Sequence, residues 1–187
     1  PDYPPGLHHL PNPPKAMFVR GCMPTNMSAA VAIVGTRRPS SNGLATAQAL
    51  SRDLAAVGLV VVSGLARGID GAAHTGALEA GGQTIAVLGC GLDIAYPPEH
   101  GQLMEQIALD GGIVTEYPLG TAPRKPHFPL RNRIIAGMCQ GVIVPECGRR
   151  SGALHTANVA LDLVREVMAV PGDVFRWQSE GPNELIR

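Results

Sequence analysis

The chain has 187 residues, of which 45% are hydrophobic, enough for one domain with a substantial core and too few to promise two. No apolar run approaches the roughly 20 residues of a membrane span, and no signal-peptide pattern opens the chain, so we expect a cytoplasmic protein without a membrane span. The formal net charge is zero, yet residues 53–116 carry −7 and the remainder +7. Neutrality therefore does not exclude a basic face that binds a polyanion.

Residues 1–28 are rich in Pro and small polar residues. This composition predicts an irregular N-terminal arm, with a possible edge strand in the apolar run 16–19. Residues 29–187 are expected to form the domain itself. Because the chain begins without Met and stops shortly after a Gly-Pro-Asn turn signal, we expect a fragment of a longer protein that lacks small flanking domains.

From residue 30 onward, continuous apolar runs alternate with segments of helical periodicity. Strands that are apolar throughout, separated by helices, indicate a parallel sheet covered on both faces. We therefore predict an α/β domain with a doubly wound, mainly parallel sheet of Rossmann-like type and helices on both faces. The predicted strands are 30–34, 59–62, 84–88, 113–115, 142–144 and 167–170, and the predicted helices are 44–57, 69–80, 97–109, 129–139 and 154–164.

Four turns that follow predicted strands carry Arg or Lys beside Gly or Ser. Glycines let backbone N–H groups approach an anion, helix N-termini favour negative charge, and Arg offers a bidentate fork to phosphate. For any one turn, a need for positive φ explains the glycines equally well. Since ligands bind beyond the carboxyl ends of parallel strands, the four turns together predict a phosphate-binding rim. They are residues 35–43, 63–68, 124–133 and 148–152.

The segment 124–133 holds four cationic side chains, no acidic residue, and an aromatic residue, Phe128. This combination favours a polyanion whose bases can stack. Pro129 suits the first turn of a helix, and Arg131 and Arg133 then point about 200° apart. We expect Arg131 to face the ligand, whereas Arg133 is as well suited to a structural ion pair. Phe128 stays open between a stacking role and a core role.

The sequence offers little sign of catalysis or of a bound cofactor. It lacks G-x-G-x-x-G after the first strand and contains no G-x-x-x-x-G-K-[ST], and its cysteines form no C-x-x-C pair. Asp70 and His74 stand at i and i+4 on a predicted helix and could form a metal or acid/base pair. We favour a cap or dipole role for Asp70 and a buried, hydrogen-bonded His74. We therefore predict no catalytic residue, no metal and no cofactor.

Several separated motifs occur in one order along the chain: Val31-Ala32-Ile33-Val34-Gly35-Thr36-Arg37, Ser63-Gly64-Leu65-Ala66-Arg67-Gly68-Ile69-Asp70, His74, Phe128-Pro129-Leu130-Arg131-Asn132-Arg133-Ile134-Ile135-Ala136-Gly137 and Arg150-Ser151-Gly152-Ala153-Leu154. In content and order they resemble the DNA-processing protein A family, also called DprA or Smf. The resemblance implies an extended Rossmann domain that binds single-stranded DNA, protects incoming DNA during natural transformation, loads the RecA recombinase and commonly forms a homodimer.

Position by position, the resemblance implies DNA contacts at Arg37, Lys125 and Phe128. Charge and placement in the turns add the other members of the expected site. One departure from the family pattern is the additional Arg in the turn 146–150. The full set of expected DNA-binding residues is Gly35, Arg37, Arg38, Ser63, Gly64, Arg67, Lys125, Phe128, Arg131, Arg149, Arg150 and Ser151.

Two other classes of function remain as alternatives. One is an enzyme of related architecture, a nucleoside-monophosphate phosphoribohydrolase. Members of that family carry a pattern similar to P-G-G-x-G-T-x-x-E after a late strand. Residues 147–154 stand there without the acid that would assist glycosidic cleavage. The other alternative is a module that senses a small nucleotide. It predicts saturable mononucleotide binding and no preference for longer strands.

Overall fold

The computed structural model describes residues 3–25 and 27–187; residues 1, 2 and 26 of the predicted arm lie outside them. Seven strands form one sheet in the order β1-β5-β4-β3-β2-β6-β7. β1 pairs antiparallel with β5, and the other neighbours are parallel. The strands are β1 Phe18–Gly21, β2 Ala30–Ile33, β3 Val60–Ser63, β4 Thr84–Val87, β5 Gly112–Thr115, β6 Gly141–Val144 and β7 Glu166–Ala169.

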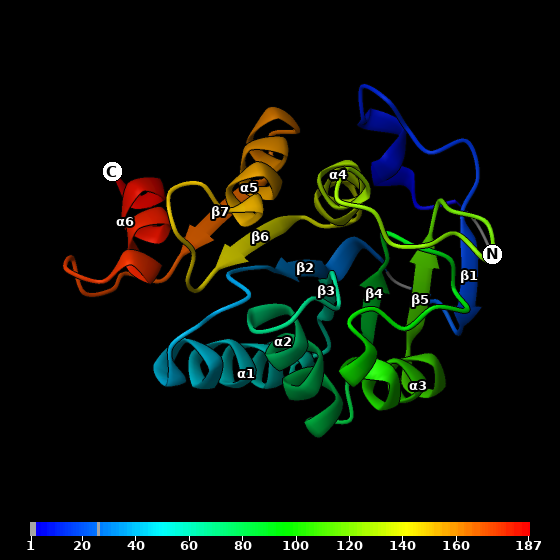
Figure 1. Ribbon diagram of the computed structural model, residues 1–187, viewed down its shortest axis with the longest axis horizontal. Helices are drawn as coiled ribbons and strands as arrows, with labels where there is room; N and C mark the ends of the chain where they lie inside the picture. The colour runs from blue at the N-terminus through cyan, green and yellow to red at the C-terminus, as the bar shows by residue number, and fades with distance from the viewer. Residues whose placement is uncertain (1–2, 26) are drawn as a thin grey trace.

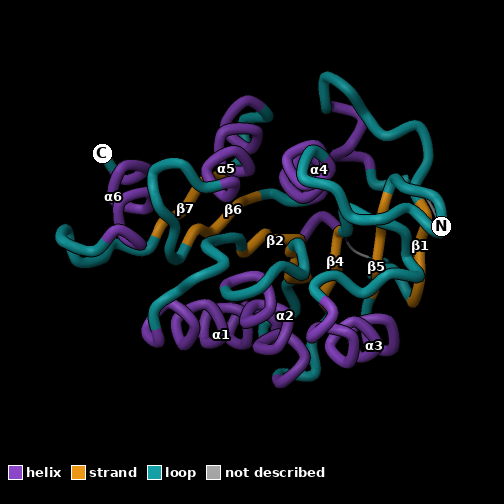
Figure 2. The backbone as a smooth tube through the Cα atoms, in the orientation of Figure 1, coloured by secondary structure: helices purple, strands orange, loops and turns teal. Residues whose placement is uncertain are grey.

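The two faces of the sheet carry different helices (Figure 1). α1 Ser41–Ala56, α2 Ile69–Glu79 and α3 Gly101–Asp110 cover one face, whereas α4 His127–Met138 and α5 Gly152–Asp162 cover the other. The tube in Figure 2 follows the same layers. The predicted doubly wound, mainly parallel α/β fold is confirmed. The remaining helices are η1 Pro5–His9, η2 Met27–Ala29, η3 Pro98–His100, η4 Trp177–Ser179 and α6 Glu180–Ile186; no described helix is long and apolar enough to cross a membrane.

The burial of the strands follows from their composition. Every residue of β2, β3, β4, β5 and β6 is buried, as expected for apolar strands with helices on both sides. The edge strands differ: in β7, exposed and half-buried residues alternate. Small side chains on α2, among them Ala73 and Ala77, allow this helix to lie close to the sheet.

The chain reverses its direction across the sheet at β2. From β2 it moves outward through β3 and β4 to β5, and α4 then returns it to β6 on the other side of β2. The turns after β2 and β6 therefore meet at a topological switch point. Ligands of doubly wound folds bind there, beyond the carboxyl ends of the strands.

The N-terminal arm contributes to the core. Leu7 and Leu10 are buried against α4, where a Cβ atom on Gly137 would lie 3.0 Å from Leu7 Cδ2. The Pro-rich composition of the arm gives no sign of this packing. The close fit of Leu7 against the backbone of α4 joins the arm to the same core as the sheet.

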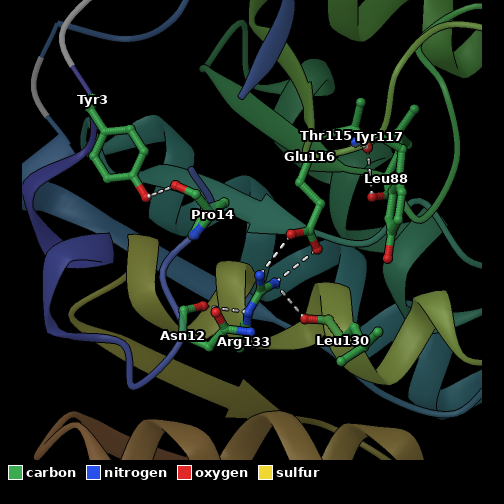
Figure 3. Close-up of polar contacts among 9 residues, drawn as sticks. All are labelled: Tyr3, Asn12, Pro14, Leu88, Thr115, Glu116, Tyr117, Leu130 and Arg133. Carbon is green, nitrogen blue, oxygen red and sulfur yellow. Dashed lines mark hydrogen bonds and ion pairs between the residues drawn. The ribbon is translucent and has the colours of Figure 1, made fainter. Parts of the chain in front are cut away.

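Arg133, on α4, holds the arm through a hydrogen bond to Asn12 and forms an ion pair with Glu116 (Figure 3). Its two terminal nitrogens donate to the carboxylate of Glu116 at 2.9 and 2.7 Å, and its Nε donates to Asn12 O at 2.9 Å. The Tyr3 hydroxyl donates to Pro14 O at 2.7 Å within the arm. Arg133 thus forms the structural ion pair that the sequence left open, and Glu116 neutralises one of the four cations that looked uncompensated.

Candidate nucleic-acid interface

A cavity of about 490 Å³ opens at the carboxyl edge of the sheet. Its volume lies within the range of small-ligand sites. Because the turns after β2 and β6 and the first turns of α2, α4 and α5 converge there, residues distant in sequence line one space. They include Gly35, Thr36, Arg37, Asp70, Tyr96, Lys125, Phe128, Arg131, Asn132, Ser151, Gly152 and Thr156.

Phe128 stands half-buried at the mouth of this cavity. The guanidinium carbon of Arg37 lies 5.1 Å from its ring centroid, within cation–π range, and Tyr96 stacks at 5.5 Å with an interplanar angle of 28°. A Cβ atom on Gly89 would lie 3.1 Å from the ring, so glycine leaves the room that the ring needs. Tyr96 is not among the residues predicted from the sequence, although its place beyond β4 puts it on the same edge of the sheet.

A second aromatic pair lies beside the first. His127 stacks on Tyr117 at 4.2 Å and 17°, and its Nδ1–H donates to Gly89 O at 3.0 Å. The carbonyl can only accept, so this contact fixes the proton on Nδ1. Consecutive residues at the start of α4 thus hold rings in defined places on the cationic edge. The sequence analysis missed this pair as well.

Arg131 lies beneath the cavity and is 3% exposed. Its Nη1 donates to Gly64 O at 2.8 Å and to Val87 O, at the carboxyl ends of β3 and β4. A side chain on Gly64 would collide with this guanidinium. Burial lowers the pKa of Arg131 to about 10, which leaves the group charged at neutral pH. Arg131 borders the cavity, but most of its donors are engaged by the protein.

Asp70 and His74 have separate structural partners. Asp70, in the first turn of α2, accepts the Gly64 N–H at 3.2 Å, and burial raises the pKa of its carboxyl despite the opposing charge of Arg131. His74 Nδ1 contacts Thr84 Oγ1 at 2.8 Å; since that hydroxyl donates to a backbone oxygen, Nδ1 carries the proton. His74 is thus buried and hydrogen-bonded, and Asp70 lies in the first turn of α2 with a backbone partner. Within the described residues, no cluster of His, Cys, Asp or Glu suits a metal ion.

The other predicted residues differ in their burial and in their hydrogen-bond or ion-pair partners. Ser63 is buried and donates to Ile33 O at 2.6 Å, while the Ser151 hydroxyl caps α5 by accepting the Ala153 N–H at 3.2 Å. Arg67 is paired with Glu99, and Arg149 lies 3.9 Å from Glu180. Gly35, in the turn after β2, is packed between Ile69 and Glu146. The exposed cations that form no ion pair with another described residue include Arg37, Arg38, Lys125 and Arg150.

The sequence matches a family model over its whole length, residues 1–187: DNA recombination-mediator protein A. It is 43% identical over 185 residues to DNA processing protein DprA of Streptococcus pneumoniae, covering 99% of this chain and 65% of that protein. Against Protein Smf of Escherichia coli, the identity is 44% over 186 residues, covering 99% and 50%. The chain thus spans about half to two thirds of these relatives.

Solved structures of two proteins named DNA processing protein A are also similar to this chain. DNA processing protein A of Streptococcus pneumoniae superposes with a TM-score of 0.92 at 42% identity, covering 98% of this chain and 65% of that one. DNA processing protein A of Helicobacter pylori, solved in work on its single-stranded DNA binding mode, superposes with a TM-score of 0.91 at 33% identity, covering 100% and 85%.

Replacing Arg131 by Met, which keeps most of its length but removes its donors, should lower the free energy of unfolding by about 3 kcal/mol. The change leaves two buried carbonyls unpaired and removes the cation nearest Asp70. Urea unfolding at neutral pH measures the loss. The matched variant Arg37→Met, at an exposed position, should cost no more than about 1 kcal/mol, the value of its cation–π contact with Phe128. Equal stability of the two variants would contradict the structural role.

Acid should weaken the fold through His74. Burial lowers the pKa of His74 to about 3 in the folded state, from 6.5 in the unfolded chain. Between these values the unfolded chain binds more protons, so this stabilisation is complete above pH 6.5 and declines as the pH falls towards 3, by about 1.4 kcal/mol per pH unit. His74→Asn, whose amide can replace Nδ1–H, should reduce the slope by that amount in urea unfolding between pH 6 and 5. An unchanged slope would refute the assignment.

Proposed function

The chain belongs to the DNA recombination-mediator protein A family, and from this premise we propose that it binds single-stranded DNA without sequence preference. The proposed site is the cavity at the carboxyl edge of the sheet together with its exposed cations. The observation that carries the proposal is the half-buried Phe128 at the mouth of the cavity, with Arg37 over its ring and Lys125 on the same turn. In the proposed site the cations bind phosphates, and the ring stacks on bases.

The combination of ring and cations favours a single strand over a duplex. An aromatic side chain can stack on any base that is not already stacked on both sides, which is why such platforms tolerate all sequences. The first turns of α4 and α5 contain no acidic residue and border the cavity. The helix dipoles at these two N-termini add to the attraction for phosphate.

The predicted residues take two kinds of role in this proposal. The exposed cations and Phe128 contact DNA directly, and the buried residues keep the platform in place. Arg131 belongs to the second group, because its guanidinium is engaged by Gly64 and Val87. Arg67 contributes less than its charge suggests, because Glu99 neutralises it. The direct group is Arg37, Arg38, Lys125, Phe128, Arg149 and Arg150, and the supporting group is Gly35, Ser63, Gly64, Arg131 and Ser151.

The finer roles follow from the family resemblance. We propose that the protein protects incoming DNA, loads the RecA recombinase on it during natural transformation, and acts as a homodimer. We also propose binding without catalysis. The engagement of Asp70 and His74 with structural partners supports this over a phosphoribohydrolase, which would release free base from AMP. The alternative of a nucleotide sensor predicts AMP binding as tight as that of a long oligonucleotide.

Lys125→Ala should weaken binding to an oligothymidylate about tenfold at low salt and reduce the slope of log K against log salt by about 0.7, because one phosphate contact is lost. Fluorescence anisotropy at several salt concentrations measures both quantities. Lys15 is the matched control, since it is the other lysine of the chain, is exposed and lies in the arm. Identical binding by the two variants would remove Lys125 from the site.

Phe128→Ala should reduce affinity for the same oligonucleotide by about 1–3 kcal/mol while the salt slope stays constant, because stacking involves no counterion release. Phe175 serves as the control because it is 94% exposed and lies far along the chain from the site. A parallel loss of affinity and of salt slope would mean that Phe128 acts by holding cations in place, and the stacking role would then be wrong.

A further inference from the structure

The N-terminus of α1 is occupied by a carboxylate of the chain itself. Glu146, in the turn after β6, accepts the Ser40 N–H on Oε2 at 2.8 Å and the Ser40 hydroxyl on Oε1 at 2.6 Å. Ser40 in turn caps the helix by accepting the Gly43 N–H at 3.0 Å. A Cβ atom on Gly43 would collide with the Glu146 carboxylate, so the acid lies directly against the first turn of α1.

This place is normally available to a ligand. In doubly wound folds, phosphate binds at the N-terminus of the helix that follows the strand at the switch point, where N–H groups and the helix dipole attract an anion. Here that helix is α1, because it follows β2 and β2 lies beside β6. A negative charge is already present at this position, and it comes from the other side of the switch point.

The main chain of Glu146 closes the same crevice. Its carbonyl oxygen accepts the Thr36 N–H at 2.8 Å, and a Cβ atom on Gly35 would lie 2.7 Å from that oxygen. Backbone and side chain of one residue therefore join the turn after β6 to the turn after β2. The position beside Ser40 and Gly43 is thereby filled, whereas Gly35, Thr36 and Arg37 of the same turn still line the cavity.

The first turn of α2 also contains an acid, but this acid belongs to the helix itself and accepts from the turn before it. At the start of α2, Asp70 accepts the Gly64 N–H, so the second N-terminus also holds an internal carboxylate. The first turns of α4 and α5 contain no acid, and the cavity lies between them. Asp70 is buried and also lines the cavity, so the acid-free part of the cavity wall is formed by the first turns of α4 and α5.

We propose that Glu146 is a specificity-determining residue that excludes the pyrophosphate group of dinucleotides and of nucleoside di- and triphosphates from α1. Phosphate groups are thereby directed to the α4–α5 side of the cavity. The exclusion is both steric and electrostatic, because the carboxylate fills the position and repels a second anion. This inference goes beyond single-stranded DNA binding and does not depend on it, since the occupied helix N-terminus concerns a different ligand.

The test is Glu146→Ala titrated calorimetrically with inorganic pyrophosphate. The emptied helix N-terminus, with Arg37 and Arg38 nearby, should bind pyrophosphate at least about tenfold more tightly than the parent protein does. Glu166→Ala is the matched control: it removes the same charge from an exposed position at the start of β7. Binding to the cations of the cavity is common to all three proteins and cancels in the comparison.

Equal dissociation constants for the parent, Glu146→Ala and Glu166→Ala would overturn the proposal, as would equal gains in the two variants. Glu146→Ser provides the same measurement if the alanine variant does not fold, because its short side chain also vacates the position and carries no charge. Oligonucleotide binding by the parent protein is measured separately. Its absence would refute the proposed DNA function and leave the pyrophosphate result standing.

Discussion

The site depends on one buried guanidinium. Arg131 donates to Gly64 O and Val87 O at the ends of β3 and β4, and this contact sets how far the first turn of α4 extends over the sheet edge. Phe128, on that same turn, takes its place at the mouth of the cavity as a result. A buried cation with hydrogen bonds to several carbonyls is costly to create and costly to displace, so the position of α4 is well defined.

Neighbouring contacts extend this constraint to the rest of the edge. Asn132 accepts a hydrogen bond from Arg131 Nε at 3.1 Å and donates to Gly152 O at 3.1 Å, so the start of α5 is held by the start of α4. On the opposite side, Glu146 joins the turns after β2 and β6. Helices and loops from distant parts of the sequence therefore form a preorganised surface, and little ordering is left for the moment of binding.

The sequence predicts the fold well because its signals are local. Apolar runs and helical spacing place the described parallel strands and the five longer helices, and the basic turns point to the correct edge of the sheet. The prediction for Arg131 shows the limit, because this residue is buried and, like Arg133, engaged by the protein. Helical geometry separates the two side chains by direction, but which one is buried depends on Glu116, Gly64 and Val87, which are distant in sequence.

The N-terminal arm shows that composition alone does not predict which residues of a segment are buried. Its prolines and polar residues indicate an irregular segment, yet two leucines within it are core residues because α4 presents the small Gly137 to them. The aromatic partners Tyr96 and Tyr117 were likewise out of reach of the sequence analysis. Each comes from a separate turn, distant in sequence, that only the folded sheet places beside α4.

The contact between Arg37 and Phe128 has a consequence for the energetics of any ligand at this ring. A base that stacks on the covered face of Phe128 must displace the guanidinium, so ligand binding is an exchange of partners and not a simple addition of one. The cation–π contact, about 0.5–1 kcal/mol at an exposed site, is subtracted from the affinity. The displaced guanidinium is at the same time free to pair with an anionic group of that ligand. Ring and cation therefore act as a coupled pair, whose separate contributions do not sum to their joint effect.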